Sequence, residues 1–410
     1  MYYTDKELCR VRTITTFIVL GKERNSWRGE IDKAADFCSQ LADQFLKNAY
    51  LVQSIRIVTN PFGEYLDTSS LKNAKADLDY ISGLLKALDL QELRIRFAIG
   101  EAINSEEIAL LPELIHAHGD LCNACVNVAL DEHGVLDNEM LQEATAAVFE
   151  IGRITPGGEG NFNFTVNFNC EPLIPYFPAS YHDSNLGNCF VIGLETPDLL
   201  VNVLQDYNGK NPGVLHNELF KGYAAVMGSA LQYHVSSVVS IIENWPAGHG
   251  FSFAGIDSSA APSKDCSSMV DVYKLMGVDY FGASGTVEAS ALLTRVFKGI
   301  TGAPLVGFSG LMLAVTEDTG LAEATRRGEF DIRSLLTYSA VCGIGLDTVP
   351  IPGASSPEKV TALMRDTGTM AFRLDKPLTV RLFPVPGVAA GESTSFESSD
   401  LCNCMVLEVP

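Results

Sequence analysis

Residues 11–20 read VRTITTFIVL, a run rich in threonine, isoleucine, valine and phenylalanine. Branched and aromatic side chains favour extended backbone, and a short apolar run is typical of a buried strand. Apolar residues at helical spacing follow over residues 32–49, and SIRIVT at residues 54–59 repeats the strand pattern before the turn NPFG. This first part of the chain therefore predicts a strand, a helix and a second strand in series.

The same alternation runs through the rest of the chain. It predicts helices over residues 71–88, 106–116, 138–151, 217–244, 286–298 and 357–370, and strands over residues 93–98, 122–130, 162–168, 189–194, 253–256 and 378–383. Strands that alternate with helices favour a mostly parallel sheet or barrel. Since no linker or change of composition interrupts the pattern, we expect residues 1–410 to form a single α/β barrel of parallel strands with surrounding helices, with residues 1–170 and 171–410 as approximate halves.

The amino-acid composition limits the kinds of partner that the protein can bind. The chain of 410 residues has 29 basic and 50 acidic residues, a net charge of −21, which would repel a phosphate backbone and argues against nucleic acid. No apolar stretch approaches the ~20 residues of a membrane span, and the first residues do not resemble a signal peptide. We therefore predict a cytoplasmic protein with a small-molecule ligand and no membrane partner; a homo-oligomer is compatible with the sequence.

Ten cysteines are scattered along the chain. In a cytoplasmic protein they are most simply free, buried thiols. Cys122 and Cys125 form a close pair downstream of His116, His118 and Asp120, which leaves a zinc site open as an alternative. The spacing does not match a known zinc signature, so we favour the structural interpretation.

Polar side chains follow several predicted strands and lie in the loops between elements. In parallel α/β folds, sites gather at the carboxyl ends of the strands. Our candidate catalytic residues are His182, Asp257, Cys342 and Asp347. Each has a structural alternative: a satisfied histidine, a carboxylate that caps the loop at Ser258 and Ser259, a buried thiol, or a loop carboxylate. A thiol that follows a helix is not activated by the helix dipole, which weakens the case for Cys342 as a nucleophile.

A second set of side chains fits ligand contact. The candidate substrate-binding residues are Arg56, Asn60, Tyr181 and Ser309. His182, Asp257 and Glu317 supply oxygen and nitrogen donors suited to a divalent ion, so a divalent metal is a candidate cofactor. Residues 342–353, which contain three glycines and two prolines, are predicted to form a loop.

Common catalytic signatures are missing from the sequence. It contains no GxGxxG after the first strand, no GxxxxGK[ST], no GxSxG and no HExxH. The sequence therefore argues against a Rossmann dehydrogenase, a P-loop NTPase and an α/β-hydrolase.

Several longer blocks are similar to a known family. RIVTNPFGEYL at residues 56–66, FPASYH at 177–182, YSAVCGIGLDTVPIPG at 338–353 and FRLDKPLTVRLFPVPGVAAGE at 372–392 resemble blocks of domain-of-unknown-function family 711, an uncharacterised conserved-region family. This resemblance implies a barrel like that of pyruvate formate-lyase. It does not imply radical chemistry, because RLFPVPG at residues 381–387 departs from the glycyl-radical loop of those enzymes. Bacterial relatives are often paired with amino-acid-sensing ACT-domain proteins, which implies a link to amino-acid metabolism.

Two functions are compatible with these features. The first is an enzyme that acts on a small polar metabolite, an amino acid or an oxo acid, through acid–base or metal-assisted chemistry, for example a hydrolase or a lyase. The second is a non-catalytic protein that binds or senses such a molecule. The sequence does not decide whether the protein is an enzyme.

Overall fold

A computed structural model describes residues 2–88, 90, 93–245 and 250–410. The strands are β1 (Arg10–Ile18), β2 (Ser54–Thr59), β3 (Arg94–Glu101), β4 (Asn123–Val128), β5 (Phe164–Phe168), β6 (Cys189–Glu195), β7 (Ser252–Asp257), β8 (Gly345–Pro352) and β9 (Leu378–Val385). The helices are α1 (Arg24–Lys47), α2 (Leu71–Lys86), α3 (Ser105–His118), α4 (Asn138–Ile154), α5 (Pro197–Lys210), α6 (His216–Asn244), α7 (Met269–Leu275), α8 (Thr286–Lys298), α9 (Thr319–Arg326), α10 (Ile332–Ser339) and α11 (Pro357–Arg373).

The nine strands form one mixed sheet in the order β7-β6-β1-β2-β3-β4-β5-β9-β8. Strands β1 to β5 run parallel, and β6 and β9 are antiparallel to their neighbours β1 and β5. The outer strands β7 and β8 run parallel to β6 and β9. The predicted α/β fold with a mostly parallel sheet is therefore confirmed, although these ladders alone do not form a closed barrel.

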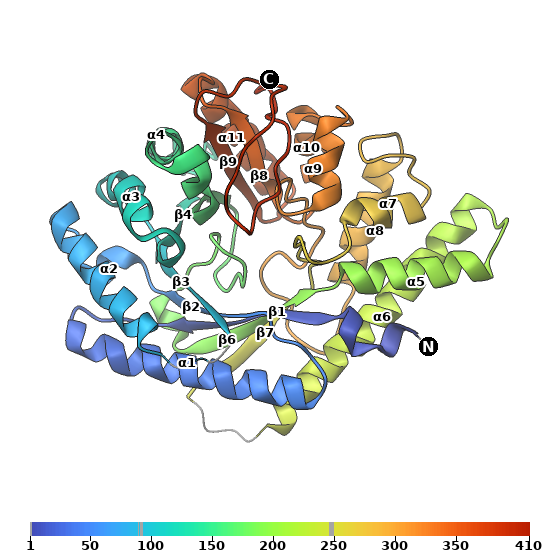
Figure 1. Ribbon diagram of the computed structural model, residues 1–410, viewed down its shortest axis with the longest axis horizontal. Coiled ribbons are helices and arrows are strands. Elements are labelled where there is room, and N and C mark those ends of the chain that lie inside the picture. The colour runs from blue at the N-terminus through green and yellow to red at the C-terminus, as the bar shows by residue number, and fades with distance from the viewer. Residues whose placement is uncertain (1, 89, 91–92, 246–249) are drawn as a thin grey trace.

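The helices lie outside the strands, and the C-terminal segment crosses the centre of the view in Figure 1. Each long helix buries one face; α1, for example, buries Trp27, Ile31, Phe37, Leu41 and Phe45. Buried apolar area of this kind is the main stabilising contribution to the fold, at about 25 cal/mol per Å². The helices thus cover the outer face of the sheet and leave its inner face to line a cavity.

The loop predicted for residues 342–353 is wrong over most of its length, because residues 345–352 form strand β8. Two prolines made this segment look like a loop, since proline cannot donate a ladder hydrogen bond. In the structure β8 stands at the end of the strand order, and Pro350 and Pro352 pair with β9 on one side only. Proline is tolerated at an edge strand, and sequence alone does not show that the strand is at an edge.

Helix α6 is the one described helix that is long and apolar enough to cross a membrane, over Glu218–Asn244. Core helices of soluble proteins meet the same criteria of length and composition. This helix contributes Leu231, Val235 and Val238 to the main hydrophobic core. It is therefore only weak evidence for a membrane span.

Candidate functional site

A cavity lies inside the fold at the amino ends of β1, β2 and β3. It has an inner chamber with about 40 Å³ of room for water-sized groups and an outer chamber with about 200 Å³. The walls of both contain Arg12, Arg56, Arg96, Phe162 and Glu317, so the two chambers adjoin one another. Room of roughly 10–15 Å³ is enough for one water molecule, so both chambers can admit a small polar group.

Arginines from three neighbouring strands form one wall. Arg56 on β2 lies opposite Arg96 on β3, and two residues earlier Ser54 lies opposite Arg94. Residues two apart on a strand share a face, and neighbouring strands are about 4.8 Å apart. Arg12 joins this wall from β1, at a shift in the register between β1 and β6. The sheet thus presents a row of guanidinium groups to the cavity.

An apolar layer closes the inner end of this row. Val58 and Ala98 come two residues after Arg56 and Arg96 on the same strands, so they share the inner face. With Phe17 they form a separate buried cluster that also contains Phe177. Phe177 is the member of this group that lines the inner chamber, so apolar packing lies behind the chamber wall on this side.

Aromatic rings cover the guanidinium groups. The centre of the Phe177 ring lies 4.9 Å from Cζ of Arg56, and the Phe162 ring lies 5.2 Å from Cζ of Arg96 and 5.1 Å from Cζ of Arg381. Such contacts orient a planar cation and leave its N–H edge available.

Arg56 is the arginine that most needs an anion. Its side chain is 5% exposed, and no ion pair to a described carboxylate is recorded for it. Its Nη1 donates to the carbonyl of Pro175 at 3.1 Å, but its Nε has no hydrogen-bond partner. Burial, with the charges of Arg96 and Arg12, lowers the pKa of Arg56 well below its usual value. A buried charge in this state is costly until a counter-ion arrives.

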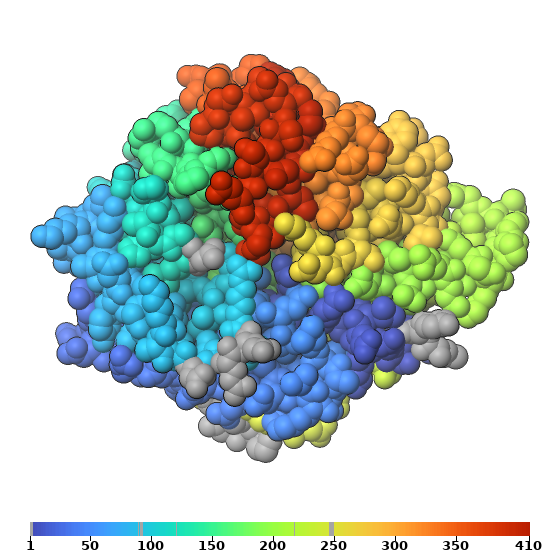
Figure 2. All heavy atoms as spheres, in the orientation of Figure 1, coloured from blue at the N-terminus to red at the C-terminus, as the bar shows by residue number. Residues whose placement is uncertain are grey.

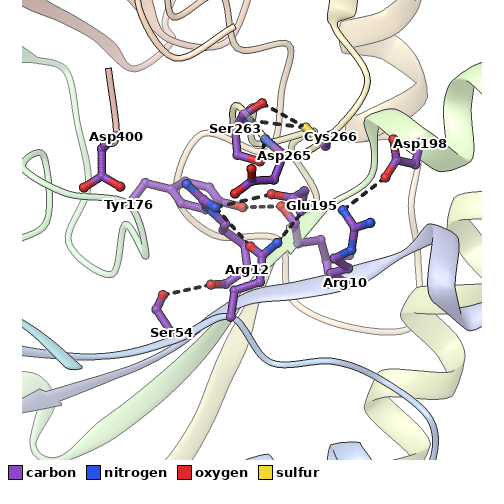
Figure 3. Close-up of polar contacts among 12 residues, drawn as sticks. Arg10, Arg12, Ser54, Tyr176, Glu195, Asp198, Ser263, Asp265, Cys266 and Asp400 are labelled. Carbon is purple, nitrogen blue, oxygen red and sulfur yellow. Dashed lines mark hydrogen bonds and ion pairs between the residues drawn. The ribbon is translucent and has the colours of Figure 1, made fainter. Parts of the chain in front are cut away.

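Figure 3 shows a network of ion pairs behind Arg12. The positive and negative charges of this network balance one another. Arg12 Nη1 lies 3.3 Å from Glu195 Oε2, and Arg10 Nη1 lies 2.8 Å from the other Glu195 oxygen and 3.0 Å from Asp198. Gln53 also donates to Glu195, at 2.7 Å. Two carboxylates therefore match two arginines here, and the network fixes the position of Arg12.

Arg381 joins two carboxylates on the opposite wall. Its Nε lies 2.7 Å from Asp347, and its Nη2 forms an ion pair with Glu317. Burial opposes the charge of Arg381, but Asp347 and Glu317 raise its pKa overall. Burial and the charge of Asp347 raise the pKa of Glu317, although Arg381 opposes this. Because one guanidinium serves two carboxylates, Glu317 is the group best placed to hold a proton.

Two chain segments narrow the mouth of the outer chamber. Asp400, near the C-terminus, accepts two hydrogen bonds from Arg94 on β3, at 2.8 and 2.6 Å. Lys264 donates to the carbonyl of Leu401 at 3.2 Å. In Figure 2 the C-terminal segment, in red, lies against the yellow segment that contains Lys264. Access to the cavity therefore runs between residues 263–265 and 399–400.

The structure brings some of the predicted site residues together and separates others. Arg56, Glu317 and Asp347 line the cavity. The remaining predicted site residues line neither chamber; they are Asn60, Tyr181, His182, Asp257, Ser309 and Cys342. Asn60 instead bonds to Leu20 and Glu64, and Tyr181 donates to the carbonyl of Cys170. The predicted site residues do not share one cavity.

Asp257 anchors a loop. Its carboxylate accepts hydrogen bonds from the backbone of Ser259, Phe308 and Ser309 and from the Ser259 hydroxyl, at 2.6–3.0 Å. Ser309 has a positive φ of 37°, so the loop needs this support. Burial raises the pKa of Asp257 to about 6, and the four hydrogen bonds oppose that rise. This geometry matches the loop-capping alternative.

His182 and Cys342 are also fully buried. The His182 ring packs against Phe17, and neither ring nitrogen has a hydrogen-bond partner among the described residues. Burial lowers the pKa of His182 to about 4, although the charge of Asp183 opposes this. The Cys342 thiol accepts a hydrogen bond from the Gly345 amide at 3.5 Å. Neither side chain faces the cavity described above.

The candidate metal ligands are not assembled. Within the part of the chain that the structure describes, no three histidine, cysteine, aspartate or glutamate side chains are grouped so that they could hold a metal ion. This applies both to His182, Asp257 and Glu317 and to the alternative around Cys122 and Cys125. These donor sets do not fit a divalent ion, and we derive no chemistry from one.

Sequence reasoning named Arg56 but missed Arg12, Arg96 and Arg381. A signal was available in the sequence, because each of these residues lies within a strand that is rich in apolar and β-branched residues. A charge within a buried strand must meet a partner or a ligand. The expectation that sites lie at carboxyl strand ends directed attention to the other end of β1, β2 and β3.

Comparison with known proteins places the chain in a family. Residues 3–398 match the family described as "Uncharacterised ACR (DUF711)". The chain belongs to this family. The resemblance identified from the sequence blocks is thereby confirmed.

Curated relatives carry the name UPF0210 protein. One from Pyrobaculum arsenaticum is 32% identical over 56% of this chain and 50% of its own length, and one from Desulforudis audaxviator is 28% identical over 71% and 64%. The chain thus spans about half to two thirds of the length of these relatives. The anaerobic ribonucleotide reductase from Thermotoga maritima, solved with citrate in its active site, has a TM-score of 0.41 and 8% identity, over 92% of this chain and 81% of that one. That TM-score is too low to establish a shared fold.

Replacing Asp257 by alanine should destabilise the protein by about 3 kcal/mol, because three backbone amides lose a charged acceptor in a buried loop. Urea unfolding at pH 7 measures this. Asp271→Ala, at a half-exposed position on α7, should change stability by less than about 0.5 kcal/mol. A loss that small in Asp257→Ala would contradict the anchoring role.

His182 should make the protein sensitive to acid. Its pKa is about 4 in the folded state and near 6.5 when unfolded, so the unfolded state binds the proton first and stability falls as pH drops from 6.5 to 4. Between pH 7.5 and 5 this costs about 2 kcal/mol. Over that interval, His182→Phe should lose about 2 kcal/mol less stability than the wild type, as measured by urea unfolding. His116→Phe, at an exposed position, is the control; equal losses in wild type and His182→Phe would refute the prediction.

Proposed function

We propose that this protein is an enzyme that binds a small carboxylate-bearing metabolite, an amino acid or an oxo acid, in the arginine-lined cavity and acts on it by acid–base chemistry. The observation that carries the proposal is Arg56, a buried guanidinium without a recorded carboxylate partner in the cavity wall. Arginine binds carboxylates through parallel hydrogen bonds, and more strongly where water is excluded.

Glu317 is our candidate for the proton-transferring group. It reaches both chambers, and its raised pKa lets it exchange a proton closer to neutral pH than an ordinary glutamate. A metabolite whose carboxylate binds Arg56 would present its neighbouring carbon to the space in front of Glu317. Arg381, held by Asp347, would stabilise negative charge that develops as a proton leaves that carbon.

A non-catalytic binding protein is the second candidate. The ion pair between Glu317 and Arg381 favours it, because a carboxylate engaged by a guanidinium is a weaker base. The same arginines would then hold the ligand without turnover. Binding alone does not separate the two functions, but proton exchange does.

The closed barrel also remains a proposal. It is supported by the segment between residues 305 and 314, since Leu305 makes a parallel bridge to Ile256 of β7 and Ala314 makes one to Asp347 of β8. One segment therefore touches both edge strands. The cytoplasmic location and the absence of nucleic-acid partners remain proposals as well, supported by ten free cysteines and the net charge of −21.

Replacing Arg56 by methionine should separate binding from stability. The variant should be as stable as the wild type or more stable by about 1 kcal/mol, because an unpaired buried charge is removed and Thr15 still donates to the carbonyl of Pro175. Its affinity for a bound carboxylate should fall at least about tenfold. Thermal shift and calorimetry with propionate, alanine and pyruvate, against chloride at equal ionic strength, measure both effects.

Arg333→Met, at an exposed position on α10, is the matched control and should bind as the wild type does. If Arg56→Met instead unfolds more easily and binds no worse, Arg56 is structural and the binding proposal fails.

Replacing Glu317 by glutamine should leave binding within about threefold and slow proton transfer by about a hundredfold or more. Proton NMR in D₂O, with pyruvate and 2-oxoglutarate as probes, measures the exchange of hydrogens next to the carbonyl. Glu323→Gln on α9, where the side chain is half-exposed, is the control. Binding without any protein-dependent exchange in the wild type would favour the binding protein over the enzyme.

A further inference from the structure

We propose that the ligand of this cavity carries two acid groups, one held by Arg56 in the inner chamber and one held by Lys264 at the mouth. This inference rests on the proposed function and narrows its ligand class from carboxylates in general to dianions. Two positions for an anion, at different depths, support it.

The inner position is set by β2 and β3. Arg56 and Arg96 are direct partners in the parallel ladder, and both line both chambers. Val58 and Ala98 follow them on the same strands and belong to a buried apolar cluster. Arg381 on the opposite wall is already engaged by Asp347 and Glu317, so Arg56 is the inner cation proposed to receive the acid group.

The outer position lies nearer the mouth of the cavity than the inner position does. Lys264 is exposed, lines only the outer chamber, and contacts a carbonyl oxygen of Leu401 with its Nζ. Arg94, at the same end of the cavity, is two residues from Arg96 on β3, a separation of about 6.6 Å along a strand. Arg94 is hydrogen-bonded to Asp400. Lys264 is therefore the cation at the mouth for which no carboxylate partner is recorded among the described residues. A second acid group nearer the mouth than the first would meet it.

The charge of the walls agrees with a dianion. Six basic side chains line the two chambers: Arg12, Arg56, Arg94, Arg96, Arg381 and Lys264. Four acidic side chains line them, so the difference is two positive charges. The network behind Arg12 adds one basic residue, Arg10, and two acidic residues, Glu195 and Asp198, so the excess of positive charge falls to one. Protonation of Glu317 would restore that excess to two. A protein with a net charge of −21 thus surrounds a cavity of the opposite sign.

Space between the two positions is suited to a short carbon chain. Phe162 and Glu317 are shared by both chambers, so they flank the path from one acid group to the other. A ring face tolerates methylene groups, and Glu317 faces the carbons between the acids. Short dicarboxylates, or a carboxylate joined to a phosphate by a short chain, are the ligands that we propose for this path.

Calorimetry with a graded series tests the proposal. Succinate, glutarate and phosphoglycolate are the two-acid probes, propionate and butyrate are the one-acid probes, and each is titrated into the full chain, into Lys264→Met and into Arg56→Met. The wild type should bind at least one two-acid probe about tenfold or more tightly than its one-acid counterpart. Lys264→Met should lose that preference while it keeps its affinity for one-acid probes, and Arg56→Met should weaken both. Lys274→Met, at a half-exposed position on α7, should behave as the wild type does.

Each other result has a distinct meaning. Equal affinity for one-acid and two-acid probes, lost in Arg56→Met, would overturn the dianion while the proposed carboxylate site stands. A two-acid preference that survives in Lys264→Met would overturn the outer position. No binding of any probe would overturn this inference together with the proposed binding function. Preference for phosphoglycolate over both dicarboxylates would identify a phosphorylated acid as the dianion.

Discussion

The structure depends on guanidinium groups that three neighbouring strands place at its interior. Arg56 and Arg96 are buried and Arg12 is partly buried on the inner face of the sheet, where a charge without a partner is unfavourable by several kcal/mol. Much of the surrounding structure can be understood as compensation for these charges. Glu195 matches Arg12, rings cover Arg56 and Arg96, and a carbonyl accepts from Arg56. The compensation is incomplete at Arg56, and that deficit makes the cavity a site for an anion.

The other carboxylates of the interior serve different purposes, which their partners reveal. Asp257 and Asp318 are enclosed by backbone amides and hydroxyl groups, and each fixes a loop or a helix start. Asp347 and Glu317 face a guanidinium instead and border open space. Burial raises the pKa of Asp257, Asp318 and Glu317 alike. A raised pKa therefore does not identify a catalytic group, whereas contact with the cavity separates Glu317 from the other two.

The sequence predicted the alternation of strands and helices well, because apolar periodicity is a local property. The prediction failed for strand β8. Pro350 and Pro352 can stand in this strand because it lies at the edge of the sheet, which the sequence does not show. For the site, residue type and loop position selected His182 and Asp257, which the structure buries away from the cavity. Their burial depends on contacts with Phe17 and with Phe308, both distant in sequence. Arg56 was selected and lies in the cavity wall, but its neighbour Arg96 becomes visible only once β2 and β3 are paired in register.

The opposition between an acidic exterior and a basic interior affects how a ligand is selected. A net charge of −21 repels an approaching anion at long range, so association gains nothing from the overall field and should not be fast. Affinity must then come from short-range contacts after the anion has lost its water, where the guanidinium interactions are strong because Arg56 and Arg96 are buried. Such a site discriminates by geometry more than by charge alone. An anion that leaves Arg56 unmatched loses most of the available stabilisation, while one that reaches it recovers that stabilisation. The pairing of β2 with β3 fixes where Arg56 and Arg96 stand in the wall, and therefore where an anion can be held.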